Sequence, residues 1–351
     1  MTDLRVAIVG NGGIYKLAHG PAWRQIPGAR VVATCDIVKE RAEQACRELE
    51  AAAAFTRIED LLEMDGIDLV DICTPSDTHA KLAVQVLRAG KHAICEKPMA
   101  LTPGDAARMI EAAEDAKRHL YIGHTRRFDR RWVQMKEQIM GGRIGEPVAV
   151  RRTERCWGAF PKEDWHWDLA RSGGVLMDLG IHVADLFSWF LDAEPTEVYA
   201  KALMVREEAQ EQGCFDFGII QVGFPRGKRG IMEVSWAHPK EYAPLYSTTE
   251  IIGTRGKLTL TDKDAAPMTV VKREIGIPRY SPLLSSFPET FVDELSHFLD
   301  CILQNTPPRI TLAQASTAVK VIATAFESIA SGRPISLPGE FQDAESRHRW
   351  L

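Results

Sequence analysis

The chain has 351 residues, a length that predicts about two domains. Hydrophobic residues make up 45% and charged residues 26%, proportions typical of a globular protein and unlike those of disordered, collagenous or low-complexity chains. The formal charge of −5, without a long run of Lys or Arg, excludes an electrostatic basis for nucleic-acid binding. No apolar run reaches the roughly 18 residues of a membrane span and no secretory leader is seen, so no membrane partner is expected.

The seven cysteines are spread along the chain and form no C-x-x-C pair. Several lie in apolar runs, as in Ile72-Cys73 and Ile94-Cys95. This pattern favours buried thiols in a reducing compartment over disulfides or a cysteine metal centre. The cytoplasm is therefore the expected location.

Strand and helix patterns alternate over the first 124 residues. Short β-rich apolar runs alternate with Ala- and Glu-rich segments of helical spacing, which predicts βαβ units and a parallel sheet covered on both faces. We expect a doubly wound α/β domain over residues 1–124. The strand-like runs cover residues 5–9, 30–35, 68–73, 91–95 and 119–123, and the helical segments cover residues 39–49, 79–89 and 103–116.

A different pattern begins near residue 145. After a helix expected over residues 174–191, runs with period two recur without intervening helices, which predicts a largely antiparallel sheet in a second domain. We expect this domain over residues 125–338, and a tail over residues 339–351. The runs cover residues 197–205, 215–224, 230–237, 247–252, 257–261 and 268–272, and helical stretches follow at 290–304 and 311–331.

A glycine-rich turn follows the first strand-like run, with the sequence Gly10-Asn11-Gly12-Gly13-Ile14-Tyr15. It is close to the G-x-G-x-x-G of dinucleotide-binding turns. There the first glycine permits a tight turn, and the second lets the backbone approach a pyrophosphate at a helix N-terminus. The third position is Tyr15, so the helix is expected to pack slightly farther from the strand. A plain glycine-rich turn is the alternative.

Asp36 ends the second strand-like run, where an acid binds the adenosine ribose hydroxyls in folds of this type. An acidic side chain repels the 2′-phosphate of NADP, so NAD is favoured as the cofactor. Lys39 and Arg41 lie nearby in the sequence and keep NADP open as an alternative. The other interpretation of Asp36 is an N-cap for the following helix.

Two further segments point to a family. One is Cys73-Thr74-Pro75-Ser76-Asp77-Thr78-His79 with the later Cys95-Glu96-Lys97-Pro98, and the other is Gly173-Gly174 leading into Asp178-Leu179-Gly180-Ile181-His182. In this order and spacing they resemble the Gfo/Idh/MocA oxidoreductases, the family of glucose-fructose oxidoreductase and inositol dehydrogenase, over nearly the whole chain. The resemblance implies an N-terminal Rossmann domain and a C-terminal α/β domain with a large open mixed sheet, with the final helix packing back toward the N-terminal domain. The exposed face of that sheet would support a homodimer or homotetramer.

The resemblance also implies an NAD(P)-dependent dehydrogenase that moves hydride between the nicotinamide and a carbinol carbon of a sugar, inositol or related polyol. Lys97, Asp178 and His182 would form its catalytic group. Substrate contacts would come from Arg127, Trp165, His166, Asp178 and His182, with His166 standing where the family often has Arg. The motif and the resemblance together give the cofactor-binding residues as Gly10, Gly12, Gly13, Ile14, Asp36, Thr74, Pro75, His79, Glu96 and Lys97.

The residue types of the catalytic group suit alcohol oxidation. Asp178 and His182 are four apart in a segment of helical spacing, so they are expected to project from one helix face. His182 can take the hydroxyl proton near neutral pH, while Lys97 can stabilise alkoxide charge or act as the final proton acceptor. Taken singly, each residue also fits a structural role. His166, Asp178 and His182 are legitimate zinc ligands, but no metal-binding motif accompanies them and no metal is expected.

Two other functions stay open at this point. A redox-neutral enzyme with tightly bound NAD would oxidise a glycoside, eliminate at the neighbouring carbon and then reduce the product. A catalytically silent NAD(P)-binding protein would keep the fold without turnover. Net formation of NADH from a simple polyol separates both from a dehydrogenase.

Overall fold

The computed structural model describes residues 3–238, 245–261, 268–271, 275–276 and 287–337. The expected tail over residues 339–351 lies outside these residues. The chain forms two compact units, and each is described by itself. Unit 1 comprises Met1–Val133, Ala170–Ser172 and Pro282–Val319, and unit 2 comprises Gln134–Leu169, Gly173–Ser281 and Lys320–Leu351.

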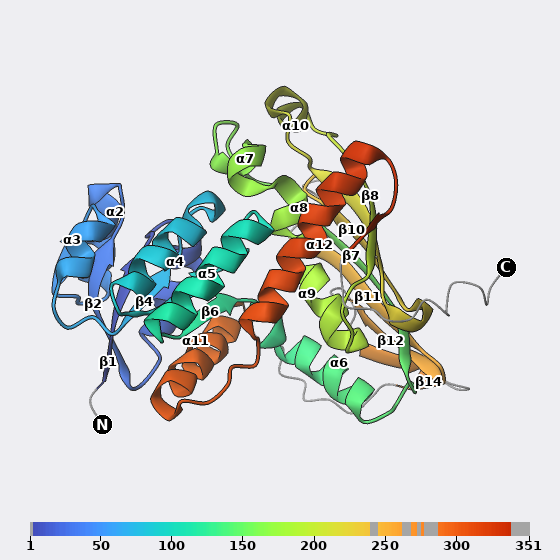
Figure 1. The fold of residues 1–351 in the computed structure, drawn as a ribbon, viewed down its shortest axis with the longest axis horizontal. Coiled ribbons are helices and arrows are strands. Elements are labelled where there is room, and N and C mark those ends of the chain that lie inside the picture. The colour runs from blue at the N-terminus through green and yellow to red at the C-terminus, as the bar shows by residue number, and fades with distance from the viewer. Residues whose placement is uncertain (1–2, 239–244, 262–267, 272–274, 277–286, 338–351) are drawn as a thin grey trace. The chain divides into compact units, whose positions relative to one another are not determined.

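Unit 1 is built on a six-stranded sheet in which all neighbouring strands are parallel (Figure 1). Val6, Ala7 and Ile8 of the central strand are fully buried, and because successive side chains alternate between faces, both faces are covered. The order β3-β2-β1-β4-β5-β6 is that of a Rossmann sheet, with the switch point between β1 and β4. The doubly wound parallel sheet expected from the sequence is confirmed. Its strands are β1 Leu4–Val9, β2 Ala29–Cys35, β3 Ala53–Phe55, β4 Leu69–Ile72, β5 His92–Glu96 and β6 Leu120–Gly123.

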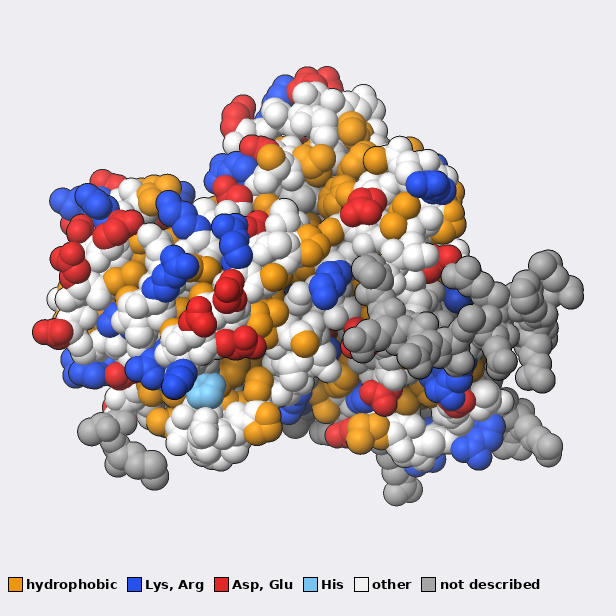
Figure 2. Space-filling view, viewed as in Figure 1, with side chains coloured by type: hydrophobic (Ala, Val, Ile, Leu, Met, Phe, Trp, Pro, Cys, Tyr) orange, Lys and Arg blue, Asp and Glu red, His pale blue; other side chains and the backbone are white. Residues whose placement is uncertain are grey.

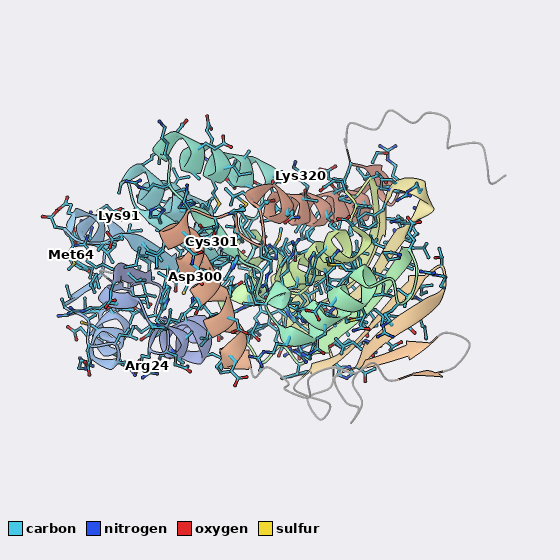
Figure 3. The ribbon with its side chains drawn as sticks, turned by 90° about the horizontal axis from the view of Figure 1, so that it is seen from below. Arg24, Met64, Lys91, Asp300, Cys301 and Lys320 are labelled. Carbon is cyan, nitrogen blue, oxygen red and sulfur yellow. The ribbon has the colours of Figure 1, made fainter. Side chains whose placement is uncertain are left out.

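The helices of unit 1 bury apolar stripes and expose charged ones. Ala83 and Val86 of α4 are fully buried, while the outer faces of α4 and α5 carry charges of both signs, which are intermingled in Figure 2. Figure 3 labels Cys301 on α11 and Arg24 just after α1, two helices that pack against each other. The helices are the π-helix η1 Tyr15–His19, α1 Gly20–Trp23, α2 Lys39–Glu48, α3 Ile58–Glu63, the 3₁₀ turns η2 Ser76–Thr78 and η3 Thr125–Arg127, α4 His79–Arg88, α5 Pro103–Ala116 and α11 Phe287–Gln304.

Three helices run along the chain from one unit into the other. They are α6 Arg130–Met140, α7 Leu169–Ser172 and α12 Leu312–Ser331. The boundaries at residues 124 and 338 that the sequence suggested stay a prediction.

Unit 2 holds a nine-stranded mixed sheet in the order β14-β13-β12-β11-β7-β10-β9-β8-β15. Among the described strands of this sheet, β7 and β10 alone pair in parallel, so the mixed, mostly antiparallel sheet is confirmed. The sequence analysis had not predicted β7, although it lies at the centre. The strands are β7 Pro147–Cys156, β8 Glu197–Leu203, β9 Phe217–Gly223, β10 Arg229–Ser235, β11 Leu245–Gly253, β12 Gly256–Thr261, β13 Met268–Val271, β14 Ile275–Gly276 and β15 Ile335–Ser336.

The prediction of a single helix over residues 174–191 is wrong. Two helices form instead, α8 Gly174–Asp178 and α9 Gly180–Leu191, and the path bends by 44° between the α7–α8 stretch and α9. Asp178 therefore ends one helix and His182 lies in the first turn of the next, so the one-face argument for this pair does not hold. α9 packs on β7 and β10. The remaining short elements of unit 2 are η4 Trp165–Trp167, α10 Glu207–Gln212 and η5 Pro225–Gly227.

All seven cysteines are free thiols, and five of them are buried. In the part of the chain that the structure describes, no single helix has the length and apolar character of a membrane span. The bent stretch from Leu169 to Leu191 meets the criterion only as a broken pair of segments.

Candidate active site

The glycine-rich turn is tied to the two neighbouring strands of unit 1. Gly10 has a φ of +91°, and a Cβ there would lie 2.7 Å from the Cys73 carbonyl carbon, so only glycine is accommodated. Its amide donates to the Cys35 carbonyl at 2.8 Å. At Gly12 and Gly13 a Cβ would meet nothing within 4 Å. The turn therefore has a fixed base and an open backbone beside the first helical turn, the arrangement that a pyrophosphate requires.

Asp36 is buried where β2 ends, and its two carboxylate oxygens hold two backbone segments. One accepts from the Asn11 amide at 2.7 Å and the other from the Val38 amide at 2.8 Å. Val38 is itself the N-cap of α2, so Asp36 supports the helix start as well as the glycine turn. The adjacent Ile37 is 92% exposed. The sequence analysis did not identify this apolar side chain as a site residue. The one indication of it in the sequence was its position directly after Asp36.

Tyr15, at the third glycine position, begins a π-helical turn rather than an α-helical one. Its ring is buried, and its hydroxyl donates to the Glu48 carboxylate at 3.3 Å. Burial and the nearby Glu48 charge raise the pKa of this phenol. Gly20 leaves the space for the ring, because a Cβ there would lie 2.8 Å from it. The tyrosine is thus packed inside unit 1.

The turns after β4 and β5 are joined through His79. Its ring nitrogens lie 2.7 Å from the Pro98 carbonyl oxygen and 2.9 Å from the Thr74 carbonyl oxygen. Burial lowers the pKa of this imidazole. The Thr78 hydroxyl donates to the Pro75 carbonyl at 2.7 Å and closes the first of the two turns. Both turns lie at the carboxyl ends of parallel strands, where open α/β sheets bind ligands.

Lys97 directly follows β5 and is partly buried. Its backbone N–H donates to the Glu96 carboxylate at 3.0 Å. The other Glu96 oxygen lies 2.9 Å from Nε2 of His19, and Glu96 itself is only 5% exposed. The Lys97 backbone is therefore held by an acid whose side chain lies inside unit 1.

Arg127 is a buried part of unit 1. Its guanidinium donates to the Gln314 side-chain oxygen at 3.0 Å, and its carbonyl accepts from Arg309 at 2.8 Å. These bonds attach the turn after β6 to the start of α12. Its predicted contact with substrate stays a prediction.

In unit 2, Asp178 is partly buried at the end of α8. Its carboxylate accepts a hydrogen bond from the Trp236 indole N–H at 3.1 Å. His182 is 9% exposed in the first turn of α9. The sequence analysis missed Trp236; an indole immediately after an alternating strand was its only signal.

An aromatic group surrounds His166 in unit 2. The Phe160 ring stacks on the imidazole with centroids 3.8 Å apart, and the Trp165 ring lies 4.0 Å away at a tilt. Nδ1 of His166 contacts the Asp164 carboxylate, which also accepts from the His166 amide at 3.0 Å. The imidazole is therefore fixed in orientation and backed by apolar faces.

The structure brings the predicted cofactor residues and Lys97 together at the carboxyl edge of the unit 1 sheet. Trp165, His166, Asp178 and His182 lie in unit 2. The joining of the two groups in one catalytic centre stays a prediction.

Comparison with known proteins decides the family. Residues 4–124 match the profile of the oxidoreductase family with an NAD-binding Rossmann fold, and residues 132–259 match the GFO/IDH/MocA C-terminal domain. The chain belongs to the GFO/IDH/MocA oxidoreductases. The family expected from the sequence is confirmed, and so is its NAD-binding character.

Two curated members of this family are similar over nearly the whole chain. Myo-inositol 2-dehydrogenase of Thermotoga maritima is 28% identical, with 95% of this chain and 98% of that protein covered. The scyllo-inositol 2-dehydrogenase (NAD(+)) of Bacillus subtilis is 29% identical, with coverage of 95% and 96%. The fold is shared with the oxidoreductase domain protein from Kribbella flavida, with a TM-score of 0.88, 24% identity and coverage of 97% and 100%.

The residues of unit 1 fit the NAD of this family. The open backbone at Gly12 and Gly13 suits the pyrophosphate, and the Asp36 carboxylate keeps lone pairs for ribose hydroxyls beyond its two amide bonds. The bare side chain of Ile37 offers an apolar surface next to that ribose position for the adenine. Lys39 and Arg41 are exposed at the start of α2, so positively charged side chains that could pair with the 2′-phosphate of NADP are also present.

Proposed function

We propose that the protein uses NAD to oxidise a CH–OH group of inositol or a closely related cyclic polyol. The observation that carries the proposal is the Lys97 turn, fixed by Glu96 and His79 at the carboxyl edge of an NAD-binding sheet. The named activity of the two full-length relatives supports inositol as the first substrate to test.

The proposed roles follow from the chemistry of the side chains. Oxidation removes a hydride from the carbinol carbon and a proton from its hydroxyl, and leaves a ketone. Bound NAD supplies the hydride acceptor. His182 takes the hydroxyl proton. Lys97 stabilises negative charge on the oxygen when it is an ammonium, or receives that proton in the end when it is a neutral amine. Asp178, oriented by Trp236, holds the substrate or His182 in place.

The aromatic group around His166 favours a ring-shaped substrate. Phe160 and the imidazole are stacked and Trp165 lies beside them at a tilt, so the group offers flat aromatic faces against which the C–H surface of a cyclic polyol packs. The imidazole replaces the arginine frequent in the family, so a neutral polyol is favoured over a sugar acid.

The assembly and the location are part of the same proposal. Apolar side chains project from the sheet of unit 2, with Leu203 59%, Ile219 45% and Ile252 36% exposed. A second copy packing on this face, in a homodimer or homotetramer, would bury them. Seven free cysteines support a reducing compartment such as the cytoplasm.

The test is the formation of NADH, followed by absorbance, with myo-inositol, scyllo-inositol, aldoses and sugar acids, each with NAD and with NADP. The proposal expects the highest kcat/KM for an inositol with NAD. Turnover of only a sugar acid would contradict the substrate class. Absence of net NADH with every compound, while NAD co-purifies, would favour redox-neutral chemistry.

A further inference from the structure

A fully buried histidine in unit 1 lies between two acids. His19 ends the π-helical turn, and its Nδ1 lies 2.8 Å from an Asp71 carboxylate oxygen while its Nε2 lies 2.9 Å from a Glu96 oxygen. All three residues are at most 5% exposed. The same Asp71 oxygen accepts from the Trp23 indole N–H at 2.7 Å.

The charge of this histidine follows from the charge of its partners. Each ring nitrogen of His19 faces a carboxylate oxygen, and two ionised carboxylates are best satisfied when both nitrogens carry a hydrogen, which makes the ring an imidazolium. A neutral ring would point a lone pair at one of the carboxylates. His79 also lies between two acceptor oxygens, but these belong to uncharged carbonyls, so burial prevails there and lowers its pKa. At His19 burial also disfavours the charge, but Asp71, together with the neighbouring Cys73, outweighs it, and the pKa is raised well above its usual value.

In the described structure, a thiol, an acid and a phenyl ring pack around His19, and none of them carries a positive charge. The Cys73 thiol, directly after the strand that carries Asp71, has its pKa raised to about 12 by burial and stays neutral. Glu294 of α11 is buried beside the cluster, and burial with the nearby Glu96 charge raises its pKa well above the usual value. The ring of Phe291 packs edge-on against the imidazole at 5.1 Å. His19 is therefore the cation that Asp71 and Glu96 share.

Glu96 links this buried ion pair to the turn proposed to do chemistry. One of its oxygens contacts His19, and the other accepts the Lys97 backbone N–H. We propose that His19 is a positioning residue, a buried imidazolium that fixes the Glu96 carboxylate and through it the backbone turn that carries Lys97. The catalytic consequence rests on the proposed function, whereas the charge of His19 and the fixing of the turn do not.

The first experiment reads the wild-type protein without substrate. Nitrogen-15 NMR of labelled histidine rings shows which ring nitrogens carry hydrogens. We expect both His19 nitrogens to be protonated near pH 8, and His92, whose pKa burial lowers to about 4, to be neutral. A neutral His19 ring at that pH would overturn the proposal. A stoichiometric metal ion that is present in the wild type and absent from His19→Gln would also overturn the proposal. The donor atoms of His19, Asp71 and Cys73 lie within 4.8 Å of one another, which is close enough for them to bind one ion.

The second experiment follows the Lys97 amide by hydrogen exchange. In His19→Gln the Glu96 carboxylate loses its cation, and we expect exchange at Lys97 to accelerate by at least about tenfold. His92→Gln is the matched control. His92 begins the strand β5 that Glu96 ends, and its replacement should leave exchange at Lys97 unchanged. Equal exchange in His19→Gln and wild type would contradict the positioning role, whatever the substrate proves to be.

The third experiment uses activity and a milder variant. Asp71→Asn keeps an acceptor for Trp23 but removes one of the two charges that stabilise the imidazolium. We expect the alkaline limb of its kcat–pH profile to lie at lower pH than the alkaline limb of the wild type. We expect His19→Gln to lose roughly ten- to a hundredfold in kcat with little change in NAD affinity. Identical alkaline limbs in wild type and Asp71→Asn would overturn the link between His19 charge and Lys97. A wild-type enzyme without any turnover would instead contradict the proposed function.

Discussion

The indole N–H of Trp236 donates a hydrogen bond to the carboxylate of Asp178 across 3.1 Å. Trp236 is fully buried directly after β10, and Asp178 is the last residue of α8. An indole can only donate, so the contact suits the ionised form of the acid. The orientation of a predicted catalytic acid thus depends on a core aromatic residue at the end of a central strand.

Trp236→Phe removes this donor and keeps an aromatic ring. A hydrogen bond to a charged group contributes about 1.5 kcal/mol or more, so we expect kcat to fall by about tenfold with NAD affinity unchanged. Steady-state kinetics with the best polyol, together with the melting temperature, would check it. Trp167→Phe is the control, since Trp167 is about equally buried and its ring packs on Trp236 with centroids 5.6 Å apart, but its indole N–H has no hydrogen-bond partner in the described structure. Equal losses in both variants would indicate a packing effect.

Lys97→Ala tests the proposed chemistry directly. General acid–base and electrostatic contributions predict a loss of at least about 10²-fold in kcat. NAD affinity should change little, because the glycine turn and Asp36 remain. Fluorescence titration with NADH and turnover assays measure the two quantities separately. Lys81→Ala, an exposed lysine of α4, is the control. Wild-type turnover in Lys97→Ala would remove this residue from the mechanism.

Asp36→Asn tests the basis of cofactor choice. The change removes the charge that repels a 2′-phosphate, yet the amide oxygen can still accept from a backbone N–H. We expect KM for NAD to rise by about tenfold and the NADP-to-NAD ratio of kcat/KM to increase, with Lys39 and Arg41 available to the phosphate. Asp68→Asn, whose acid pairs with Arg5 at 2.9 Å, should leave that ratio unchanged. An unaltered ratio in Asp36→Asn would show that selectivity lies elsewhere.

The sequence predicted five of the six strands of unit 1, because each of these is an apolar run with a distinct turn after it; the short β3 Ala53–Phe55 was missed. It failed at β7, whose sequence Arg151-Arg152-Thr153-Glu154-Arg155 has the charge density of a surface loop. The structure shows how these charges enter a central strand. Arg152 and Glu154 are both buried and bonded to each other at 3.0 Å, and Arg152 also donates to Thr249 at 2.8 Å on the neighbouring strand. Charged side chains that are buried by pairing within a strand and by bonding to its neighbour leave no period-two hydrophobic signal.

The residues of the candidate site also divide into those that the sequence predicted and those that it did not. The motifs placed Gly10, Asp36, Thr74 and Lys97 at the ends of parallel strands, because those positions follow from local sequence. The break after Asp178 and the partners Trp236 and His19 depend on tertiary contacts. His19 is brought to Asp71 and Glu96, residues 52 and 77 positions away, and no spacing rule predicts such a pairing.

The charge of His19 also predicts a pH dependence of stability. Its pKa is raised in the folded state, so its contribution is fully present below the unfolded pKa of about 6.5 and is lost as pH rises through the raised value. Urea unfolding of wild type and His19→Gln should therefore differ by a constant free energy at mildly acidic pH. The difference should shrink on the alkaline side, by at most about 1.4 kcal/mol per pH unit. A difference that grows with pH would mean that the folded ring is neutral.

The titration of Glu294 predicts a contribution to stability opposite in sign to that of His19, because Glu294 destabilises the fold as the pH rises. It is 1% exposed, its pKa is raised well above the usual value by burial and by the Glu96 charge, and its Oε1 has no hydrogen-bond partner in the described structure. Above about pH 4.5 the unfolded chain gains stability by releasing this proton while the folded chain keeps it, so the residue destabilises the fold increasingly up to its raised pKa. Glu294→Gln has nearly the same shape and does not titrate.

We therefore expect Glu294→Gln to be more stable than the wild type at neutral pH and no more stable below about pH 4.5. Between these limits the gain should grow by up to about 1.4 kcal/mol per pH unit, as measured by urea unfolding. Glu289→Gln, an exposed acid on the same helix, should show no such pH-dependent gain. If Glu294→Gln is instead less stable at neutral pH, Glu294 is ionised in the folded protein, and the His19 imidazolium balances three carboxylates rather than two.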